Sequence, residues 1–222
     1  METLRASIKY APYYFGLSRF IYRDRLFDWK YGVETRSRVS LDELDISYDS
    51  KRFGRNYGPS DPVIFKEMLS CLKIKHEDFA FVDFGSGKGR AILMASEFPF
   101  KRIIGIEFSA ALNDTARNNI RQYKSRTQKC RDLEVIESDA TAYEIPNERA
   151  VLYFNNPFIE PIMAKCLENI RRSLEEHPRE IFIAYSYGTP EMDKFVESSS
   201  FLRKVASTYQ YFIYQNSGEL LR

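Results

Sequence analysis

The fold of this chain is decided by one stretch, Phe81-Val82-Asp83-Phe84-Gly85-Ser86-Gly87-Lys88-Gly89-Arg90, in which an apolar run breaks into three glycines at alternate positions. A second apolar run, Ile103-Ile104-Gly105-Ile106, ends in the carboxylate of Glu107, 22 residues beyond Gly85. Alternate glycines let the backbone turn sharply out of a strand and approach a ligand where a Cβ would clash. The helix that follows offers its N-terminus to that ligand. Together the two stretches predict a nucleotide-like pocket.

Apolar strands and amphipathic helices alternate along the chain around this loop. Strands are predicted at 79–84, 102–107, 133–137, 150–154 and 181–186, and helices at 62–75, 90–97, 109–126, 161–176 and 190–198. Two β-rich runs, 201–206 and 209–215, are predicted to close the chain as an antiparallel hairpin. Such alternation is typical of an α/β fold, a doubly wound and mostly parallel sheet with helices on both faces.

We expect two parts in the 222 residues, an N-terminal extension and lid at 1–59 and one main domain at 60–222. The extension is rich in aromatic residues and basic, because residues 1–40 hold eight Lys or Arg against four Asp or Glu. A helical arm that packs its aromatic side on the main domain is one interpretation. An arm that grips a substrate and a helix that lies on lipid head groups are the alternatives.

Composition excludes several classes of protein. The net charge of +2 argues neither for nor against nucleic acid as a partner. Three widely spaced cysteines indicate reduced thiols and a cytoplasmic protein, and two histidines without a cysteine pair give a metal site little support. No run of about 18 apolar residues indicates a membrane span or a secretory signal.

The spacing of the glycines decides between three ligands. A phosphate-binding P-loop needs Gly-x-x-x-x-Gly-Lys-Ser/Thr, but Gly89 follows Lys88 and Val82 stands five residues before Gly87. A dinucleotide fingerprint needs Gly-x-Gly-x-x-Gly, and here the third glycine comes one residue early. The remaining pattern, Asp-x-Gly-x-Gly-x-Gly, suits the small nucleoside S-adenosylmethionine, whose ribose hydroxyls Glu107 could bind.

With these motifs the chain resembles the class I S-adenosylmethionine-dependent methyltransferases over about residues 60–216. Asp83 to Gly89 match the first motif of that family, Glu107 its ribose acid and Ser138-Asp139-Ala140 the acid that meets the adenine amino group. The family resemblance implies a seven-stranded Rossmann-like sheet whose last strand is antiparallel and inserted between the fifth and the sixth.

The resemblance also implies a set of cofactor-binding residues. They are Tyr57, Asp83, Gly85, Ser86, Gly87, Gly89, Glu107, Phe108, Asp139, Ala140 and Asn155. In this set Asp83 would hold the methionine amino group of the cofactor. Asp83 could instead only cap the loop, and Asp139 could be a plain turn residue. For Lys88 and Arg90 the interpretation is a solvated or capping role.

Asn155-Asn156-Pro157-Phe158 closes the fourth strand, where the catalytic motif of the family lies. It resembles the Asn/Asp-Pro-Pro-Tyr/Phe motif of amino-group methyltransferases, with Asn156 in place of the first proline. We therefore expect Asn155, Asn156 and Phe158 to be catalytic. A strand-ending turn is the structural alternative. The glycine loop is also similar to that of lysine methyltransferases, including the histone-core type, with Tyr57-Gly58-Pro59-Ser60 as the loop that closes over the cofactor.

The function expected from these motifs is N-methylation of a protein side chain, a lysine-like amine, by in-line methyl transfer. Such a displacement depends on alignment of the acceptor with the methyl group and requires no metal or covalent nucleophile. A protein is preferred as the methyl acceptor, and nucleic acid or a small molecule remains the alternative. A protein that keeps the cofactor pocket, lacks catalysis and binds a partner through its N-terminal arm is the competing hypothesis, and a Rossmann-type oxidoreductase is a weaker one.

Overall fold

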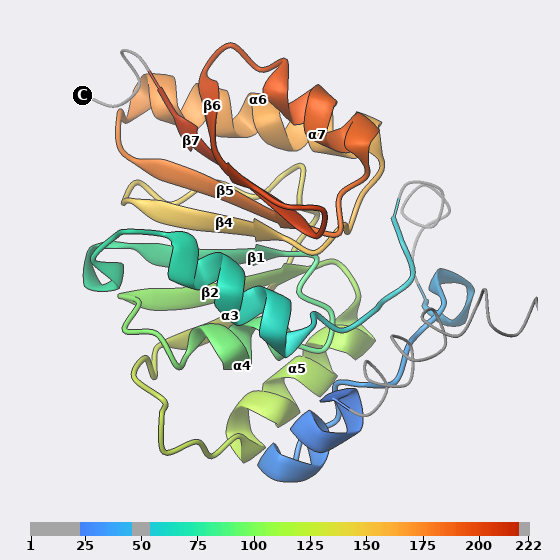
Figure 1. The fold of residues 1–222 in the computed structure, drawn as a ribbon. Helices are drawn as coiled ribbons and strands as arrows, with labels where there is room; N and C mark the ends of the chain where they lie inside the picture. The colour runs from blue at the N-terminus through green and yellow to red at the C-terminus, as the bar shows by residue number, and fades with distance from the viewer. Residues whose placement is uncertain (1–22, 46–53, 218–222) are drawn as a thin grey trace, which may run out of the picture.

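A computed structural model describes residues 23–45 and 54–217, which form one sheet with helices on both faces (Figure 1). The strands are β1 (Ala80–Phe84), β2 (Arg102–Glu107), β3 (Leu133–Glu137), β4 (Ala150–Phe154), β5 (Ile181–Ser186), β6 (Leu202–Ser207) and β7 (Tyr211–Asn216). The helices are α3 (Pro62–Cys71), α4 (Arg90–Ala95), α5 (Ala110–Gln122), α6 (Glu160–Glu176) and α7 (Pro190–Glu197), with short 3-10 turns η1 (Leu41–Glu43) and η2 (His76–Asp78). A further helix occupies residues 23–31.

The strand order in the sheet is β3-β2-β1-β4-β5-β7-β6. Strand β1 pairs in parallel with both β2 and β4, whereas β7 lies antiparallel between β5 and β6. This confirms the predicted seven-stranded sheet and its inserted last strand. Because the chain order reverses between β1 and β4, a crevice is expected at the carboxyl ends of these two strands. The glycine loop and residues 155–158 both begin there.

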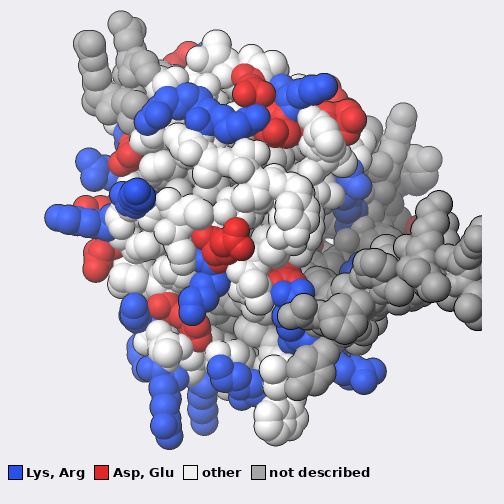
Figure 2. All heavy atoms as spheres, viewed as in Figure 1, with Lys and Arg blue, Asp and Glu red and all other residues white. Residues whose placement is uncertain are grey.

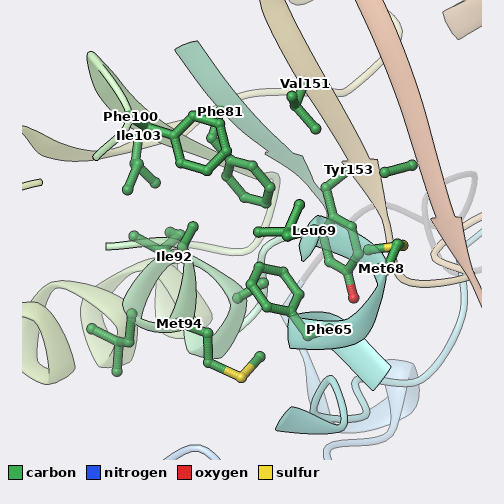
Figure 3. Packing of buried hydrophobic residues seen from close by; sticks show 14 of the residues in the cluster. Phe65, Met68, Leu69, Phe81, Ile92, Met94, Phe100, Ile103, Val151 and Tyr153 are labelled. Carbon is green, nitrogen blue, oxygen red and sulfur yellow. The ribbon is translucent and has the colours of Figure 1, made fainter. Parts of the chain in front are cut away.

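Both faces of the sheet are buried, as continuous apolar strands require. On one face, Phe65 and Leu69 of α3 pack with Ile92 of α4 over Phe81 and Tyr153 of the sheet (Figure 3). On the other face, helices α6 and α7 cover the residues that alternate with these along the strands. Five strand predictions agree with the structure within one residue at each end.

Local side chains fix where the helices begin and end. The side chain of Asp61 accepts hydrogen bonds from Val63 N (2.8 Å) and Ile64 N (3.3 Å), so it is the N-cap of α3. Ser109 caps α5 in the same way, through Leu112 N. Helix α5 ends at Gln122, four residues before the predicted end. The reason is tertiary, because the Tyr123 ring packs against Tyr31, with centroids 4.8 Å apart, in an extended backbone conformation.

The N-terminal segment 23–36 packs on α4 and α5 through a buried ionic network. The Arg90 guanidinium is 1% exposed, pairs with Asp24 and Asp28, donates to Thr35 Oγ1 (2.6 Å) and lies over the Phe27 ring. The solvated or capping role predicted for Arg90 is therefore wrong. The aromatic side of helix 23–31 packs inward, as the first interpretation of the arm expects, and the arm before residue 23 lies outside the described residues.

The described residues contain neither of two features that define other classes of protein, a membrane-spanning helix and a metal site. No helix among them is long and apolar enough to cross a membrane. They contain no cluster of His, Cys, Asp or Glu that could hold a metal ion. The three cysteines are free thiols.

Candidate active site

The glycine loop between β1 and α4 has the backbone conformation that its sequence predicts. Gly85, Gly87 and Gly89 all have positive φ, at 76°, 52° and 81°. The N–H groups of Gly85 and Ser86 donate to Ile106 O (2.8 and 3.0 Å), which fastens the loop to the end of β2. A Cβ at Gly85 would lie 2.7 Å from the Cβ of Pro157, so the loop also sits tightly against the chain that leaves β4.

Glu107 is held at the mouth of this loop by backbone donors. Its carboxylate accepts hydrogen bonds from Gly87 N (3.0 Å) and Ser109 N (2.9 Å), and the residue is buried. Burial raises the pKa of Glu107, and the two backbone N–H groups act in the opposite direction. Glu107 lines a pocket with Phe108 and Leu112 on one side. The predicted ribose acid and the residue after it are therefore both in the pocket.

Tyr57 covers the glycine loop. A Cβ on Gly87 would lie only 2.2 Å from Tyr57 Cδ2, so the aromatic ring rests directly on the glycine backbone. The Tyr57 hydroxyl donates to Thr35 O (2.7 Å), and Tyr57 N donates to Val39 O (2.9 Å). The N-terminal segment thus holds the ring in place, and burial raises the pKa of the Tyr57 hydroxyl, which stays a neutral donor.

Asp83 lies near the Tyr57 ring. Its side chain lines a second, smaller cavity together with Ser60, Ser86 and Asn155. The residue is 2% exposed, and none of the described residues donates a hydrogen bond to its carboxylate. Burial, and to a lesser extent the nearby Glu107, raise the pKa of Asp83 well above its usual value. Ser86 Oγ is also buried without a hydrogen-bond partner among the described residues. A polar ligand group or a water that enters this cavity would satisfy both groups.

These features test whether the site fits S-adenosylmethionine. Asp83 offers a carboxylate without a donor among the described residues to an ammonium group, and Gly85 lines both cavities, which places them side by side along the glycine loop. Glu107 offers carboxylate oxygens in the larger, partly apolar pocket, where a nucleoside can lie. The residues present therefore fit a nucleoside that carries an amino acid.

The corner after β4 separates the roles of two asparagines. Asn155 donates from Nδ2 to Gly58 O (3.0 Å) and accepts at Oδ1 from Ser186 Oγ (2.8 Å), so its side chain fastens the segment beside Tyr57 to the end of β5. Asn156 accepts from the Tyr185 hydroxyl (3.2 Å), and its Nδ2 has no partner among the described residues. Its φ of 47° is one that asparagine tolerates and proline cannot adopt, which explains the missing first proline.

The remaining predicted residues, Phe158, Ala140 and Asp139, lie in three different places. Phe158 is buried against Phe154 and lines the larger pocket, whereas Ala140 packs in the core on the α6 side of the sheet. Asp139 is exposed, and its carboxylate accepts from Thr141 N (2.7 Å) and Thr141 Oγ1 (2.8 Å) in the turn after β3. The structure does not place Asp139 in the pocket lining, and its contact with adenine stays a prediction.

Part of the pocket lining is absent from the predicted set. Leu41, Leu44, Arg55 and Asn56 all line the larger pocket, and Asn56 Oδ1 accepts a hydrogen bond from Leu41 N (3.0 Å). They come from the loop-rich region before residue 60, in which no helical or strand periodicity exists to mark inward-facing positions. The neighbouring Tyr57-Gly58-Pro59-Ser60 motif was the signal that could have identified these residues. Residues next to a loop that closes over a ligand tend to line the same ligand pocket.

The fold, the glycine loop and the two acids together define a class I S-adenosylmethionine-dependent methyltransferase. Residues 41–181 match the model of the family described as histone methylation protein DOT1. That match spans more than half of the chain, from η1 through the glycine loop to the start of β5. The chain therefore belongs to the DOT1 family. No curated protein matches its sequence.

Solved structures share the fold at low sequence identity. A precorrin-6y C5,15-methyltransferase from Geobacter metallireducens GS-15 is similar with 16% identity and a TM-score of 0.50, over 81% of this chain and 95% of that one. The 23S rRNA methyltransferase ErmE matches at 12% identity and a TM-score of 0.50, over 74% and 72% of the two chains. A putative S-adenosylmethionine-dependent methyltransferase from Methanococcus maripaludis matches at 16% identity and a TM-score of 0.50, over 71% of this chain and 85% of that one. These similarities concern the fold alone.

We expect Glu107→Ala to weaken the binding of S-adenosylhomocysteine by more than tenfold. A buried carboxylate that binds hydroxyls contributes about 1.5 to 3 kcal/mol through one charge-assisted hydrogen bond. Titration calorimetry on the folded variant measures the affinity. Glu134→Ala, at an exposed position of the neighbouring strand β3, is the matched control and is expected to bind normally. Unchanged affinity in Glu107→Ala would refute the ribose assignment.

We expect Gly87→Ala to disturb the site through Tyr57. An alanine there would have its Cβ inside the ring and would keep a positive φ, which costs about 1 to 2 kcal/mol. Gly32→Ala is the matched control, since Gly32 has a φ of 66° but no atom of the described residues within 4 Å of an added Cβ. Both variants are expected to lose stability in urea unfolding. Only Gly87→Ala is expected to lose at least tenfold in cofactor affinity, and equal affinities would show that the ring is free to move away.

Proposed function

We propose that this protein transfers a methyl group to a lysine-like amine on a protein substrate. The observation that carries the proposal is the match of residues 41–181 to the family described by histone methylation. The matched span includes the Tyr57 segment, the glycine loop and the Asn155 to Phe158 corner, which are the parts that build the pocket.

The chemistry of the corner supports an amine as the acceptor. S-adenosylmethionine supplies an electrophilic methyl group, and the acceptor must present a lone pair in line with it. Asn156 lines the pocket, its Nδ2 has no partner among the described residues, and its Oδ1 and backbone carbonyl can accept hydrogen bonds from an amine. Tyr185 fixes the Asn156 side chain, and Phe158 forms an apolar wall. In this proposal Asn156 orients the acceptor, Asn155 positions the corner and Phe158 excludes water.

A lysine has to lose a proton before it can attack. The acceptor end of the site holds amides and aromatic rings, and the guanidinium of Arg55 lines the same pocket close enough to act on Tyr185. Burial and a nearby cation both favour the neutral amine over the ammonium form. Aromatic faces also tolerate the positive charge of a methylated product. A nucleobase is the alternative acceptor, for which the similarity to the 23S rRNA methyltransferase ErmE supplies only a shared fold.

The test is transfer of a tritiated methyl group from labelled S-adenosylmethionine into a cell lysate, followed by separation of protein, RNA and small molecules. We expect label in protein, and acid hydrolysis is expected to release it as methyl-lysine. Glu107→Ala, which should bind the donor poorly, is the control for background labelling. Label in RNA or in small molecules would contradict the proposed acceptor. If the protein binds the donor but transfers no methyl group, the result would support the competing hypothesis, a protein that keeps the cofactor pocket and lacks catalysis.

We also propose a cytoplasmic location for the protein. The three free thiols, at Cys71, Cys130 and Cys166, support it because a reducing compartment keeps cysteines unpaired. Fractionation of cells that express a tagged chain tests this, and recovery with secreted or membrane fractions would contradict it.

A further inference from the structure

The segment from the end of α5 to β3 is strongly basic. Residues 117–131 contain six Lys or Arg and no Asp or Glu, whereas the whole chain has a net charge of +2. Arg117 pairs with Asp114. The other five are exposed and have no ion-pair partner among the residues that the structure describes: Arg121, Lys124, Arg126, Lys129 and Arg131. We call these five residues the basic face.

The backbone of the basic face is held firmly from inside. Glu97 Oε1 accepts hydrogen bonds from Tyr123 OH (3.2 Å), Ser125 Oγ (2.9 Å) and Thr127 Oγ1 (2.6 Å). These three donors alternate along the chain with Lys124 and Arg126, which are exposed. The N–H groups of residues 129 and 130 also donate to Ser96 O (2.7 and 3.0 Å). The loop therefore presents its cations on a fixed backbone, and a ligand need not order it.

Folding alone does not explain this concentration of charge. A cation in the last turn of a helix interacts favourably with the helix dipole, which accounts for Arg121. The other four cations follow the end of α5 at Gln122 and lie beyond that effect. The acidic side chains nearest in sequence are Asp132 and Glu134, and neither pairs with a cation of the basic face. Unpaired like charges on a fixed loop repel one another and lower stability, so a ligand is the simpler explanation.

We propose that the basic face binds the phosphate backbone of a nucleic-acid duplex. A duplex offers regularly spaced negative charge, which the five exposed cations, Arg121 in the last turn of α5 and four on the fixed loop after it, can match without reading a base sequence. A membrane surface is disfavoured because none of the large exposed hydrophobic residues of the described chain lies within 117–131. A protein partner is disfavoured for the same reason, since tight protein interfaces need a buried apolar or aromatic anchor.

The basic face is separate from the methyl-transfer pocket. Helix α5 begins beside Glu107, runs for 13 residues and so ends about 20 Å from that pocket. In Figure 2, Lys and Arg side chains project from the lower edge of the molecule, below the region where Figure 1 shows α4 and α5. A duplex bound at this edge leaves the carboxyl ends of the strands open to a substrate.

The test is fluorescence anisotropy with the full chain and a labelled 20-base-pair DNA duplex. The variant is the triple substitution Lys124→Gln, Arg126→Gln and Arg131→Gln. The matched control is Lys165→Gln, Arg172→Gln and Lys194→Gln, which removes the same charge from exposed positions of α6 and α7. We expect the variant to lose at least tenfold in affinity and the control less than twofold. The slope of log K against log salt should fall by about 2.7 in the variant, for three phosphate contacts.

Cofactor affinity is measured in all three proteins to confirm that they are folded, and it should not change. Equal losses in the variant and the control would overturn the proposal, because binding would then follow net charge alone. Absence of duplex binding by the unmodified chain would overturn it too. Vesicles that contain phosphatidylserine and a polyglutamate peptide are the competitors. If either displaces the duplex at equal charge concentration, the face is a membrane or protein surface instead.

Discussion

Replacing both Asp24 and Asp28 with alanine is expected to lower the free energy of unfolding by about 3 to 5 kcal/mol. The two carboxylates are the ion-pair partners of Arg90, which is 1% exposed. Without them a buried guanidinium keeps its charge and loses its compensation, which is the costly way to break a buried ion pair. Urea unfolding followed by circular dichroism measures the change.

Two further variants separate this network from general effects of charge. Asp114→Ala breaks the exposed pair with Arg117 and is expected to cost less than about 1 kcal/mol. Adding Arg90→Met to the double alanine variant removes the stranded charge and should restore a large part of the stability. A double variant no less stable than Asp114→Ala would show that the network does not hold the segment.

The Arg90 network also changes what removal of the N-terminal arm should do. From the sequence, deletion of residues 1–31 is expected to spare cofactor binding and to impair use of the substrate. The structure shows that this deletion removes Asp24, Asp28 and the Phe27 ring under Arg90. The truncated protein is therefore expected to be unstable, and the segment from residue 23 acts as a structural layer behind the glycine loop.

Where a strand or helix carries its own periodic signal, the sequence was sufficient to predict it. Strands β1 to β5 are short apolar runs bounded by polar or glycine residues, and β7 between β5 and β6 followed from the family resemblance. The glycine loop and Glu107 were predictable for a similar reason, because φ > 0 and a buried carboxylate restrict the residue types that fit.

Contacts between distant segments could not be predicted in this way. The sequence contains no sign that Arg90 would pair with residues 62 and 66 positions earlier, or that Tyr57 would reach Thr35 O across 22 residues. Such contacts depend on how irregular segments fold back on the sheet, and single residues in them have no periodicity. Asp139 is an example in which the sequence pattern suggests a place in the pocket lining that the structure does not give it. Its position after β3 fits the family pattern, but its carboxylate accepts hydrogen bonds from Thr141 in the turn that follows the strand.

Asp83→Asn is expected to raise stability and to lower cofactor affinity at the same time. The Asp83 carboxylate is buried beside Glu107 and has no hydrogen-bond donor among the described residues. Its ionised form is therefore disfavoured in the folded protein, and its pKa is raised well above the ordinary value of 3.8. An asparagine of nearly the same shape carries no charge to bury. It also loses the charge-assisted bond to an ammonium group, worth about 1.5 to 3 kcal/mol, or at least tenfold in affinity.

The gain in stability expected for Asp83→Asn depends on pH, and the raised pKa of Asp83 fixes the direction of that dependence. A carboxyl whose pKa is higher in the folded state binds more protons there than in the unfolded chain, so stability falls as pH rises from the unfolded pKa through the raised folded one. The stability gained by Asp83→Asn should therefore be smallest near pH 4 and should grow toward neutral pH. Thermal unfolding across that range and calorimetry with S-adenosylhomocysteine measure the two effects, with the exposed Asp114→Asn as the neutral control. If Asp83→Asn kept full affinity, the carboxylate would not be the group that receives the cofactor. If its stability followed that of the unmodified protein at every pH, the pKa of Asp83 would not be raised in the folded state.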